Sequence, residues 1–476
     1  MIDFQDTTWP RVVASHFSEP SLLFCAGREH VSPQVGITVF GPRSLDQEER
    51  HPERVKVGFV GSGATVGSAQ SWMASCIPGV PGDADHRAFP GWQDDRGFFS
   101  TLLLDNGDWV ETLTQHELSS VSRLKKARDR FELGLSIIVD KIRLLAEKDR
   151  PPEYVIIALP NSLLAKCRVA DYRDPRVGTV HRDLRRAIKS EAMRYRLPTQ
   201  IVLQRTMEAT PASRNVDHKS RCAWNFFTGL YFKAGGIPWA PTGLRPGTCY
   251  VGISFYRPLG SESSIVRSSV AQAFDEHGDG IVLRGQDFVW DEDRQGRSPH
   301  LDESGAHELI KMVLKRYQDE MKQTPTRVVI HKSSRFWPEE RAGFEAALID
   351  IREFDLLAVT PSSHIRLLRA GKYPPLRGTK FSVGDVHFLY TTGFIHSLGV
   401  YPHGHVPSPL QIADHFGDSD VDTLLSEILI LTKLNWNSAN FAGLMPITLR
   451  FSRLVGDILR EIPSTREPLP QFKYYM

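Results

Sequence analysis

Residues 181–204 read HRDLRRAIKSEAMRYRLPTQIVLQ, and residues 223–239 read AWNFFTGLYFKAGGIPW. In the first segment apolar residues recur at steps of four, four and three, the spacing of one face of a helix. The chain then passes through Pro198 into the strand-like run IVL. The second segment keeps a helical pattern until Gly235 and Gly236 end it. The sequence therefore predicts a helix, a short strand and a second helix, and the apolar face of the first helix contains Leu184, Ile188, Ala192 and Tyr195.

The first of these helices is basic on one side. Six Arg or Lys residues lie between positions 181 and 196, against two acidic residues. Arg185 and Lys189 are one turn apart beside the apolar face. A basic helix face that meets the end of a strand can hold a phosphate group through charge-assisted hydrogen bonds. The same pattern also fits a charged face that only contacts solvent.

The order Arg185, Lys189, Gln200 and then Lys233, with Lys233 inside the run LYFKAGGIPW, resembles the MID domain of Argonaute proteins. The resemblance implies that these four side chains hold the 5′ phosphate of a guide strand. It covers roughly residues 110–476.

Composition sets the broad class. The chain has 476 residues and a formal net charge of only +2, so any nucleic-acid surface must be local. Its five cysteines form no CxxC pair, which is typical of reduced thiols in a cytoplasmic protein. The N-terminus lacks a signal-peptide pattern, and no window of 18 residues is continuously apolar. We expect a cytoplasmic protein of two or three domains.

Strand and helix patterns alternate from residue 118 to residue 233. Residues 118–148 read as one long helix, and residues 154–159, YVIIAL, as a buried strand. This alternation predicts a parallel, Rossmann-like sheet. After residue 247, strands followed by a helix and strand alternation predict a ribonuclease-H-like fold. We expect an α/β protein with an N-terminal region of uncertain fold (1–109), a MID domain (110–240) and a PIWI domain (241–476).

A glycine-rich turn offers a different hypothesis. Gly61, Gly63 and Gly67 follow a strand pattern and approximate a dinucleotide-binding turn, although the spacing differs from GxGxxG by one residue. This alternative is a nucleotide-dependent enzyme.

The resemblance implies a PIWI domain that would cut with carboxylates holding two divalent metals. Anionic oxygens are needed there to neutralise two close cations. Ser254 and Ser333 occupy the positions of the first two acids, and the segment 433–437, KLNWN, holds no acid either. We therefore expect a nuclease-dead chain with no catalytic residues. The alternative is an active guided nuclease with displaced acids.

Residues 361–380 carry five basic residues and no acid. We expect this stretch to follow a nucleic-acid backbone, and the alternative is a solvated loop. The loop histidines His403 and His405 have metal-like spacing without a nearby third ligand. Asp414, Asp418, Asp420 and Asp422 belong to an acidic loop expected to cap the next helix. The five basic residues are Arg366, Arg369, Lys372, Arg377 and Lys380.

The chain ends in apolar residues where most termini are polar, at Phe472, Tyr474, Tyr475 and Met476. The resemblance implies that the Met476 carboxylate reaches the guide pocket and helps to hold a structural Mg²⁺ beside the 5′ phosphate. Simple packing of the tail is the alternative.

The resemblance is to a short prokaryotic Argonaute, because the chain has no room for separate N and PAZ domains. It implies guide RNA and target DNA as partners in defence against invading DNA. It also implies an effector protein with an APAZ domain, either a sirtuin-like or TIR NADase or a nuclease, which recognition of the target activates. No membrane partner is expected.

Overall fold

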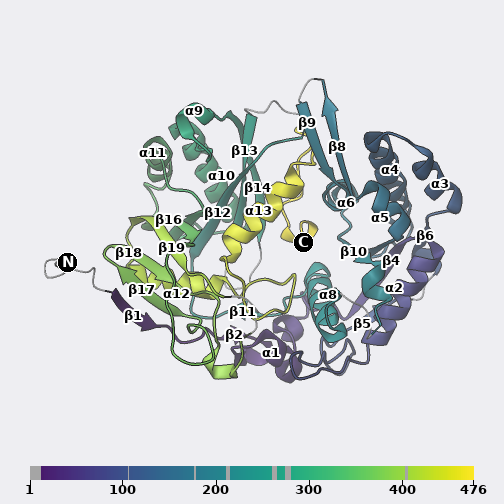
Figure 1. Ribbon diagram of the computed structural model, residues 1–476, viewed down its shortest axis with the longest axis horizontal. Coiled ribbons are helices and arrows are strands. Elements are labelled where there is room, and N and C mark those ends of the chain that lie inside the picture. Colours follow the sequence, from purple (N-terminus) through teal and green to yellow (C-terminus); the bar gives the residue numbers. More distant parts are fainter. Residues whose placement is uncertain are drawn as a thin grey trace, which may run out of the picture.

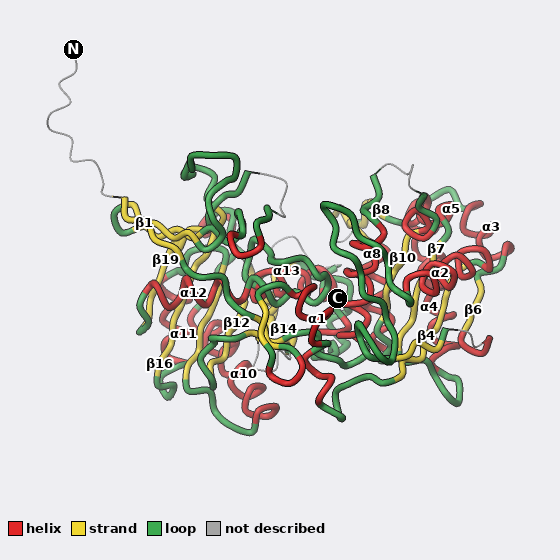
Figure 2. Tube along the Cα trace, turned by 90° about the horizontal axis from the view of Figure 1, so that it is seen from below, coloured by secondary structure: helices red, strands yellow, loops and turns green. Residues whose placement is uncertain are grey.

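The computed structural model describes residues 12–104, 107–175, 178–210, 215–259, 265–273, 280–401 and 406–476. Its strands form one sheet of nine strands, one of five, and two small sheets. Figures 1 and 2 show the two large sheets side by side, with the C-terminus between them.

The five-stranded sheet is parallel throughout. Its central strand β7 is buried at every residue, as expected of a strand covered on both faces. Helices α4 (Ala127–Ala146) and α6 (Leu184–Ala192) cover one face, and α2 (Gly63–Cys76) and α8 (Lys219–Lys233) cover the other. The strand order is β10 (Thr199–Leu203), β7 (Tyr154–Leu159), β4 (Arg54–Gly61) and β5 (Thr101–Leu103), and β6 (Val110–Thr112) also pairs with β4.

The nine-stranded sheet is mixed. Its three central strands β12, β15 and β16 are parallel, and the strands outside them pair antiparallel. Its order is β1 (Val12–His16), β17 (Thr379–Val383), β18 (Val386–Leu389), β19 (Leu410–Gly417), β16 (Glu353–Pro361), β15 (Arg327–Lys332), β12 (Thr248–Tyr256), β13 (Ile265–Ala273) and β14 (Ile281–Val289).

Helices cover both faces of this sheet as well. Residues of α10 (Glu303–Met321) and α11 (Pro338–Ala347) pack on one face, against alternate residues of β12 and β15. The opposite face packs against α12 (Val421–Leu431) and α13 (Ile447–Leu459). This second core continues into α8 of the parallel unit, where Phe232 stacks on Trp436 at 4.7 Å between ring centroids. The α/β architecture expected from the sequence, a Rossmann-like unit followed by a ribonuclease-H-like unit, is confirmed.

The N-terminal 109 residues do not form a separate region. Strand β1 extends the nine-stranded sheet by pairing with β17, whereas β4 lies inside the parallel sheet between β7 and β5. In the chain between β1 and β4 lie β2 (Leu22–Leu23), β3 (Glu29–His30) and α1 (Pro33–Phe40). Strands β2 and β3 form a small sheet with β11 (Ala240–Pro241). The boundary expected at residue 109 therefore falls within the parallel unit, because β4 contributes buried residues to both of its faces.

The helix expected over residues 118–148 is two helices. A capping box of Thr114 and Glu117 starts α3 (Gln115–Arg123), and the backbone turns extended at Leu124 before α4 begins. Among the described helices, none is both long and apolar enough to cross a membrane.

Candidate nucleic-acid interface

Two helix ends bring the basic side chains of the parallel unit together. Asp183 caps α6 by accepting a hydrogen bond from the Arg186 N–H at 3.1 Å, and the apolar face of this helix packs into the core. Lys189, in the last turn of α6, then points to the first residue of β10. Lys233 reaches the same place from the last residue of α8.

The two glycines after α8 are needed for its sharp ending. Gly235 has φ = 107°, a backbone conformation that residues with a side chain rarely adopt. A Cβ on Gly236 would lie 2.3 Å from the Tyr231 ring. The GG pair therefore stops the helix directly after Lys233, as the sequence predicts.

Lys189 and Lys233 donate to the same acceptor. Their Nζ atoms lie 3.1 and 3.2 Å from the main-chain oxygen of Thr199. Lys233 also donates to Oε1 of Gln200 at 2.5 Å, and Lys189 donates to the main-chain oxygen of Met476. Three of the predicted phosphate-site residues and the last residue of the chain thus meet at the start of β10. Both lysines are buried, at 2% and 1% exposure.

The two ammonium groups repel each other, and no described Asp or Glu side chain pairs with them. Burial lowers the pKa of Lys189 well below its ordinary value, and repulsion from Lys233 and Arg185 adds to the effect. Burial, with repulsion from Arg185, lowers the pKa of Lys233 to about 7. No described Asp or Glu forms an ion pair with either amine, so an oxyanion at this place would relieve the repulsion.

Arg185 lies one turn before Lys189 and is exposed. It makes no hydrogen bond or ion pair with any residue that the structure describes, whereas its neighbour Arg186 pairs with Asp457 of α13 at 2.8 Å. The guanidinium of Arg185 is therefore available to a ligand. Gln200, the remaining member of the predicted set, is half-buried on β10.

A cavity of about 350 Å³ borders this site. Lys233 lines it together with Tyr195, Arg196 and Lys473. Sequence reasoning missed Lys473 and the Thr199 carbonyl. Any residue has such a carbonyl, so no side-chain pattern could have marked Thr199. Lys473 is the one cation of the tail QFKYYM, and a lone cation in an otherwise apolar ending is the signal that could have marked it.

The oxygens of this site do not fit a resident Mg²⁺ in the guide-free chain. Magnesium needs about six oxygen ligands, and it favours carboxylates and phosphates. The Thr199, Gln200 and Met476 oxygens here already accept hydrogen bonds from lysine ammonium groups. The ammonium groups hold the positions that a cation would take, so no step of the function is assigned to magnesium.

The basic stretch of residues 361–380 divides into two sets. Arg366, Arg369 and Lys372 are exposed, in the loop between β16 and β17. Arg377 is buried at 2% exposure and donates to Glu19, which removes it from the expected backbone-contacting surface. Lys380 is half-buried and pairs with Asp422. Arg377 therefore lies away from the surface, whereas Lys380 remains at the surface in an ion pair with an exposed acid.

Ser254 and Ser333 lie at neighbouring positions of the nine-stranded sheet. The register pairs Ile253 with Lys332. Ser254 therefore lies near the end of β12 beside Ser333, which directly follows the parallel strand β15. Ser254 is half-buried and Ser333 is exposed. Two acids that contact residues 332–336 already have partners. Glu340 is buried against Lys332 and His300, and Asp414 accepts a hydrogen bond from the Phe336 N–H at 3.0 Å.

The remaining candidates have structural roles or lie outside the described residues. Asp420 caps α12 by accepting from the Thr423 N–H at 2.9 Å, as expected, and Asp418 accepts from the Phe354 N–H at 3.0 Å. His403 and His405 fall outside the described part of the chain.

The glycine-rich turn joins β4 to α2. A Cβ on Gly61 would lie 2.3 Å from the Ala158 carbonyl, whereas Gly63 and Gly67 have open space around them. In a dinucleotide-binding turn the glycines allow close approach of a phosphate and of the helix. Here packing against β7 explains Gly61, and the open space at Gly63 and Gly67 does not test the nucleotide hypothesis, which stays an alternative.

Comparisons with solved structures identify the fold. The chain is similar to Clostridium butyricum Argonaute bound to a guide DNA and a 19-mer target DNA, with a TM-score of 0.67 and 16% identity over 95% of this chain and 53% of that one. It is also similar to Marinitoga piezophila Argonaute in complex with a 5′ OH guide RNA, with a TM-score of 0.59 and 11% identity over 97% of this chain and 59% of that one.

Drosophila Piwi gives a TM-score of 0.57 and 12% identity over 97% of this chain and 56% of that one. The chain therefore spans about half the length of the structures that it matches, and its fold is Argonaute-like. No protein-family model and no curated protein sequence matches it.

Proposed function

We propose that this chain, whose fold is Argonaute-like, binds a guide nucleic acid through its 5′ phosphate and presents the guide for pairing with a target strand. The observation that carries the proposal is the meeting of the buried Lys189 and Lys233 ammonium groups on the Thr199 carbonyl, without an Asp or Glu partner among the described residues. Lys189 also donates to the main-chain oxygen of Met476. Keeping two like charges together in a buried site is costly unless an anion joins them.

A phosphate monoester fits the charges of this site. It carries close to two negative charges at neutral pH and three acceptor oxygens. Lys189 and Lys233 would offset most of that charge. The exposed Arg185, one helical turn before Lys189, would provide a third cation. The Gln200 amide would donate a hydrogen bond to a phosphate oxygen or to the first nucleotide.

We further propose RNA as the guide and DNA as the target. Base pairing would supply the sequence specificity, while the protein contacts the backbone and the 5′ end. The exposed residues Arg366, Arg369 and Lys372 would contact phosphates along the bound strands. The solved Argonautes that support a guided function were bound to guide DNA, target DNA or guide RNA.

The same proposal makes the chain a sensor that does not cut. Ser254 and Ser333 carry no charge, and a hydroxyl is a poor ligand for the two metal ions that phosphodiester cleavage needs. The response to a target would then come from an effector protein with an APAZ domain, either a sirtuin-like or TIR NADase or a nuclease, in defence against invading DNA.

Nucleic acid extracted from the purified chain tests the proposal. We expect short RNAs that resist 5′-end labelling until a phosphatase has removed a 5′ phosphate. The Lys189→Met and Lys233→Met double variant should lose these RNAs. A bound nucleotide cofactor with its own absorbance, and no RNA, would instead favour the enzyme hypothesis built on Gly61, Gly63 and Gly67. Chains free of both would contradict the guide proposal.

A further inference from the structure

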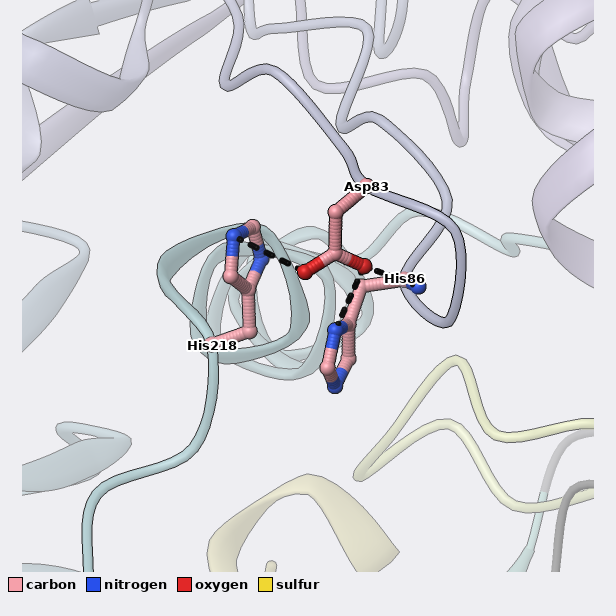
Figure 3. A group of neighbouring side chains, drawn as sticks. All are labelled: Asp83, His86 and His218. Carbon is pink, nitrogen blue, oxygen red and sulfur yellow. Dashed lines mark hydrogen bonds and ion pairs between the residues drawn. The ribbon is translucent and has the colours of Figure 1, made fainter. Parts of the chain in front are cut away.

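Three potential metal ligands meet where a long loop of the parallel unit contacts α8. Asp83 and His86 belong to the loop between α2 and β5, and His218 is the N-cap residue of α8. Figure 3 shows one oxygen of the Asp83 carboxylate directed to His218 and the other to His86. Its Oδ1 lies 2.8 Å from Nδ1 of His86, and its Oδ2 lies 3.7 Å from Nε2 of His218. One ligand atom from each residue lies within 4.8 Å of the other two.

Contacts beside the ligands hold them in place. The Ser220 hydroxyl donates to the Arg87 carbonyl at 2.6 Å, and the Trp224 indole N–H donates to the Ala88 carbonyl at 3.1 Å. The Phe89 ring packs edge-on against Trp224 at 5.3 Å between ring centroids. The loop is thus fixed to α8 immediately after His86. The three ligands are therefore held together by packing that does not depend on them.

The two imidazole rings are stacked, 4.7 Å between centroids and 13° apart. Neutral imidazole is the form that binds a metal ion. Two imidazole nitrogens and one carboxylate oxygen are a ligand set that suits zinc and its neighbours in the first transition row.

We propose that Asp83, His86 and His218 bind one divalent transition-metal ion, with Zn²⁺ preferred, and that this ion clasps the loop after α2 to the N-terminus of α8. Three protein ligands leave one position of a tetrahedral zinc site for water. The ion would fix the start of the helix whose last residue is Lys233.

Metal binding changes the local contacts. Zinc lies about 2.0–2.2 Å from nitrogen and oxygen ligands. The exposed Asp83 and the half-exposed His86 must therefore shift, and the hydrogen bond between Asp83 Oδ1 and His86 Nδ1 is replaced by bonds to the metal. Nδ1 of His218 accepts a hydrogen bond from the Ser220 N–H at 3.3 Å. Coordination through Nε2 moves the ring proton to Nδ1 and ends that long bond.

Zinc uptake by the full-length, tag-free chain tests the proposal. After removal of metal with a chelator, equilibrium dialysis against Zn²⁺ should show saturable binding of one ion per chain. Asp83→Asn and His218→Gln should each weaken this binding at least tenfold. Zn²⁺ should also raise the midpoint of thermal unfolding of the unaltered chain, and slow trypsin cleavage after Arg87.

Matched variants separate a built site from general binding to surface side chains. Asp85→Asn removes a neighbouring exposed carboxylate, and His181→Gln breaks a two-member His–Asp pair with Asp171. Both should bind zinc like the unaltered chain. His86→Gln, in the loop, decides the matter if the other variants fail to fold. Absence of saturable binding, or equal binding by His86→Gln, would overturn the proposal.

Discussion

At the scale of single residues, two buried lysine side chains meet at the start of β10. Lys189 and Lys233 are each buried, and each has a pKa lowered mainly by burial. No described Asp or Glu side chain pairs with either amine, and burying amines without side-chain counter-charges is costly. An anion bound beside them would offset this cost, so the two amines favour a doubly charged ligand.

Replacing either amine by an apolar residue of similar length should reduce binding selectively. We expect Lys189→Met and Lys233→Met each to weaken a 5′-phosphorylated guide by about 1.5–3 kcal/mol, the value of a hydrogen bond to a charged group. Binding of a 5′-hydroxyl guide should hardly change. Filter binding with both guides measures the difference, and Lys166→Ala, an exposed lysine on α5 (Asn161–Cys167), is the control. Equal weakening of both guides would mean that the lysines only support the fold.

The pH dependence follows from Lys233. Its pKa in the folded chain is about 7, below the ordinary value of 10.5, so the unfolded chain holds the proton more tightly. The guide-free chain should therefore gain stability as the pH rises from about 7 towards 10.5, and Lys233→Met should lack this gain. Thermal unfolding at a series of pH values measures it.

The same titration affects guide binding with the opposite sign. A bound phosphate favours the ammonium form, so binding takes up a proton above pH 7 and affinity falls as the pH rises to 9. The phosphate contributes little to this fall, because its second pKa is near 6. Lys233→Arg keeps its charge and should flatten the profile. A profile that Lys233→Arg leaves unchanged would assign the pH dependence to another group.

At the scale of elements, a buried charge cluster joins the segment after β1 to the nine-stranded unit. The Glu19 carboxylate accepts from Nε of Arg377 at 3.0 Å and from Nζ of Lys433 at 2.9 Å. Burial alone would raise the pKa of Glu19, but the attraction of these two cations outweighs it and the pKa is lowered. Lys433 also donates to the Pro20 and Val31 carbonyls at 2.7 Å each. The cluster therefore fixes residues 19–31 onto the sheet.

Removing the charge of Glu19 should destabilise the chain strongly. Glu19→Gln leaves two buried cations without a counter-charge, and such a loss costs about 3–5 kcal/mol. Urea unfolding measures the free energy, with the exposed Glu29→Gln as a control. In the unaltered chain the contribution of Glu19 should disappear as the pH falls through its lowered pKa. If Glu19→Gln lowers the free energy of unfolding no more than Glu29→Gln does, solvent already screens the cluster.

The loop between β16 and β17 presents cations of a different kind. Arg366, Arg369 and Lys372 are exposed next to Leu368, which is 98% exposed. Tyr373 in the same loop stacks on Phe394 at 4.3 Å between ring centroids. This stacking holds the basic side of the loop on the surface.

Replacing these three cations by Ala should lower the salt dependence of binding to a guide-paired target. The slope of log K against log salt should fall by about one unit for each phosphate that the variant leaves without its cation. Titrations at several salt concentrations measure it. A triple Ala variant of the exposed lysines Lys125, Lys311 and Lys315 matches the charge removed and should leave the slope unchanged. An equal fall of the slope in both triple variants would mean that the loop contributes only a general electrostatic effect.

At the scale of the whole molecule, the two candidate sites lie in different units. Lys189 and Lys233 meet beside the parallel sheet, whereas Ser254 and Ser333 lie on the nine-stranded sheet. The C-terminal segment joins them, since Gln471 bridges to Ile281 of the nine-stranded unit and Met476 accepts from Lys189 of the parallel unit. Guide binding at the first unit is thus separable from the chemistry that the second unit would need.

We therefore expect the purified chain to cut neither strand of a matched guide and target, with Mg²⁺ or with Mn²⁺. Denaturing gels of labelled guide and target measure this. The Ser254→Asp and Ser333→Asp double variant restores two carboxylates at adjacent strand ends and serves as a comparison. Guide-dependent cutting at a fixed position by the unaltered chain would establish an active site with displaced acids.

The sequence by itself determined the local elements and much of the candidate site. The uniformly apolar run of β7, the end of α8 at Gly235 and the one-turn spacing of Arg185 and Lys189 depend on neighbours within a few residues, so periodicity and glycine placement predict them. The resemblance that these segments carry was enough to anticipate both folds.

Tertiary structure alone decided which charges are buried and which distant segments meet. Arg377 resembled its exposed neighbours in sequence, yet its partner Glu19 lies 358 residues away. Residues 1–109 contribute to both large sheets because β1 and β4 pair with strands far along the chain. His218 meets Asp83 and His86 only because the loop after α2 packs on α8. Local periodicity cannot encode such pairings, since they depend on the complementarity of surfaces that fold together from separate parts of the chain.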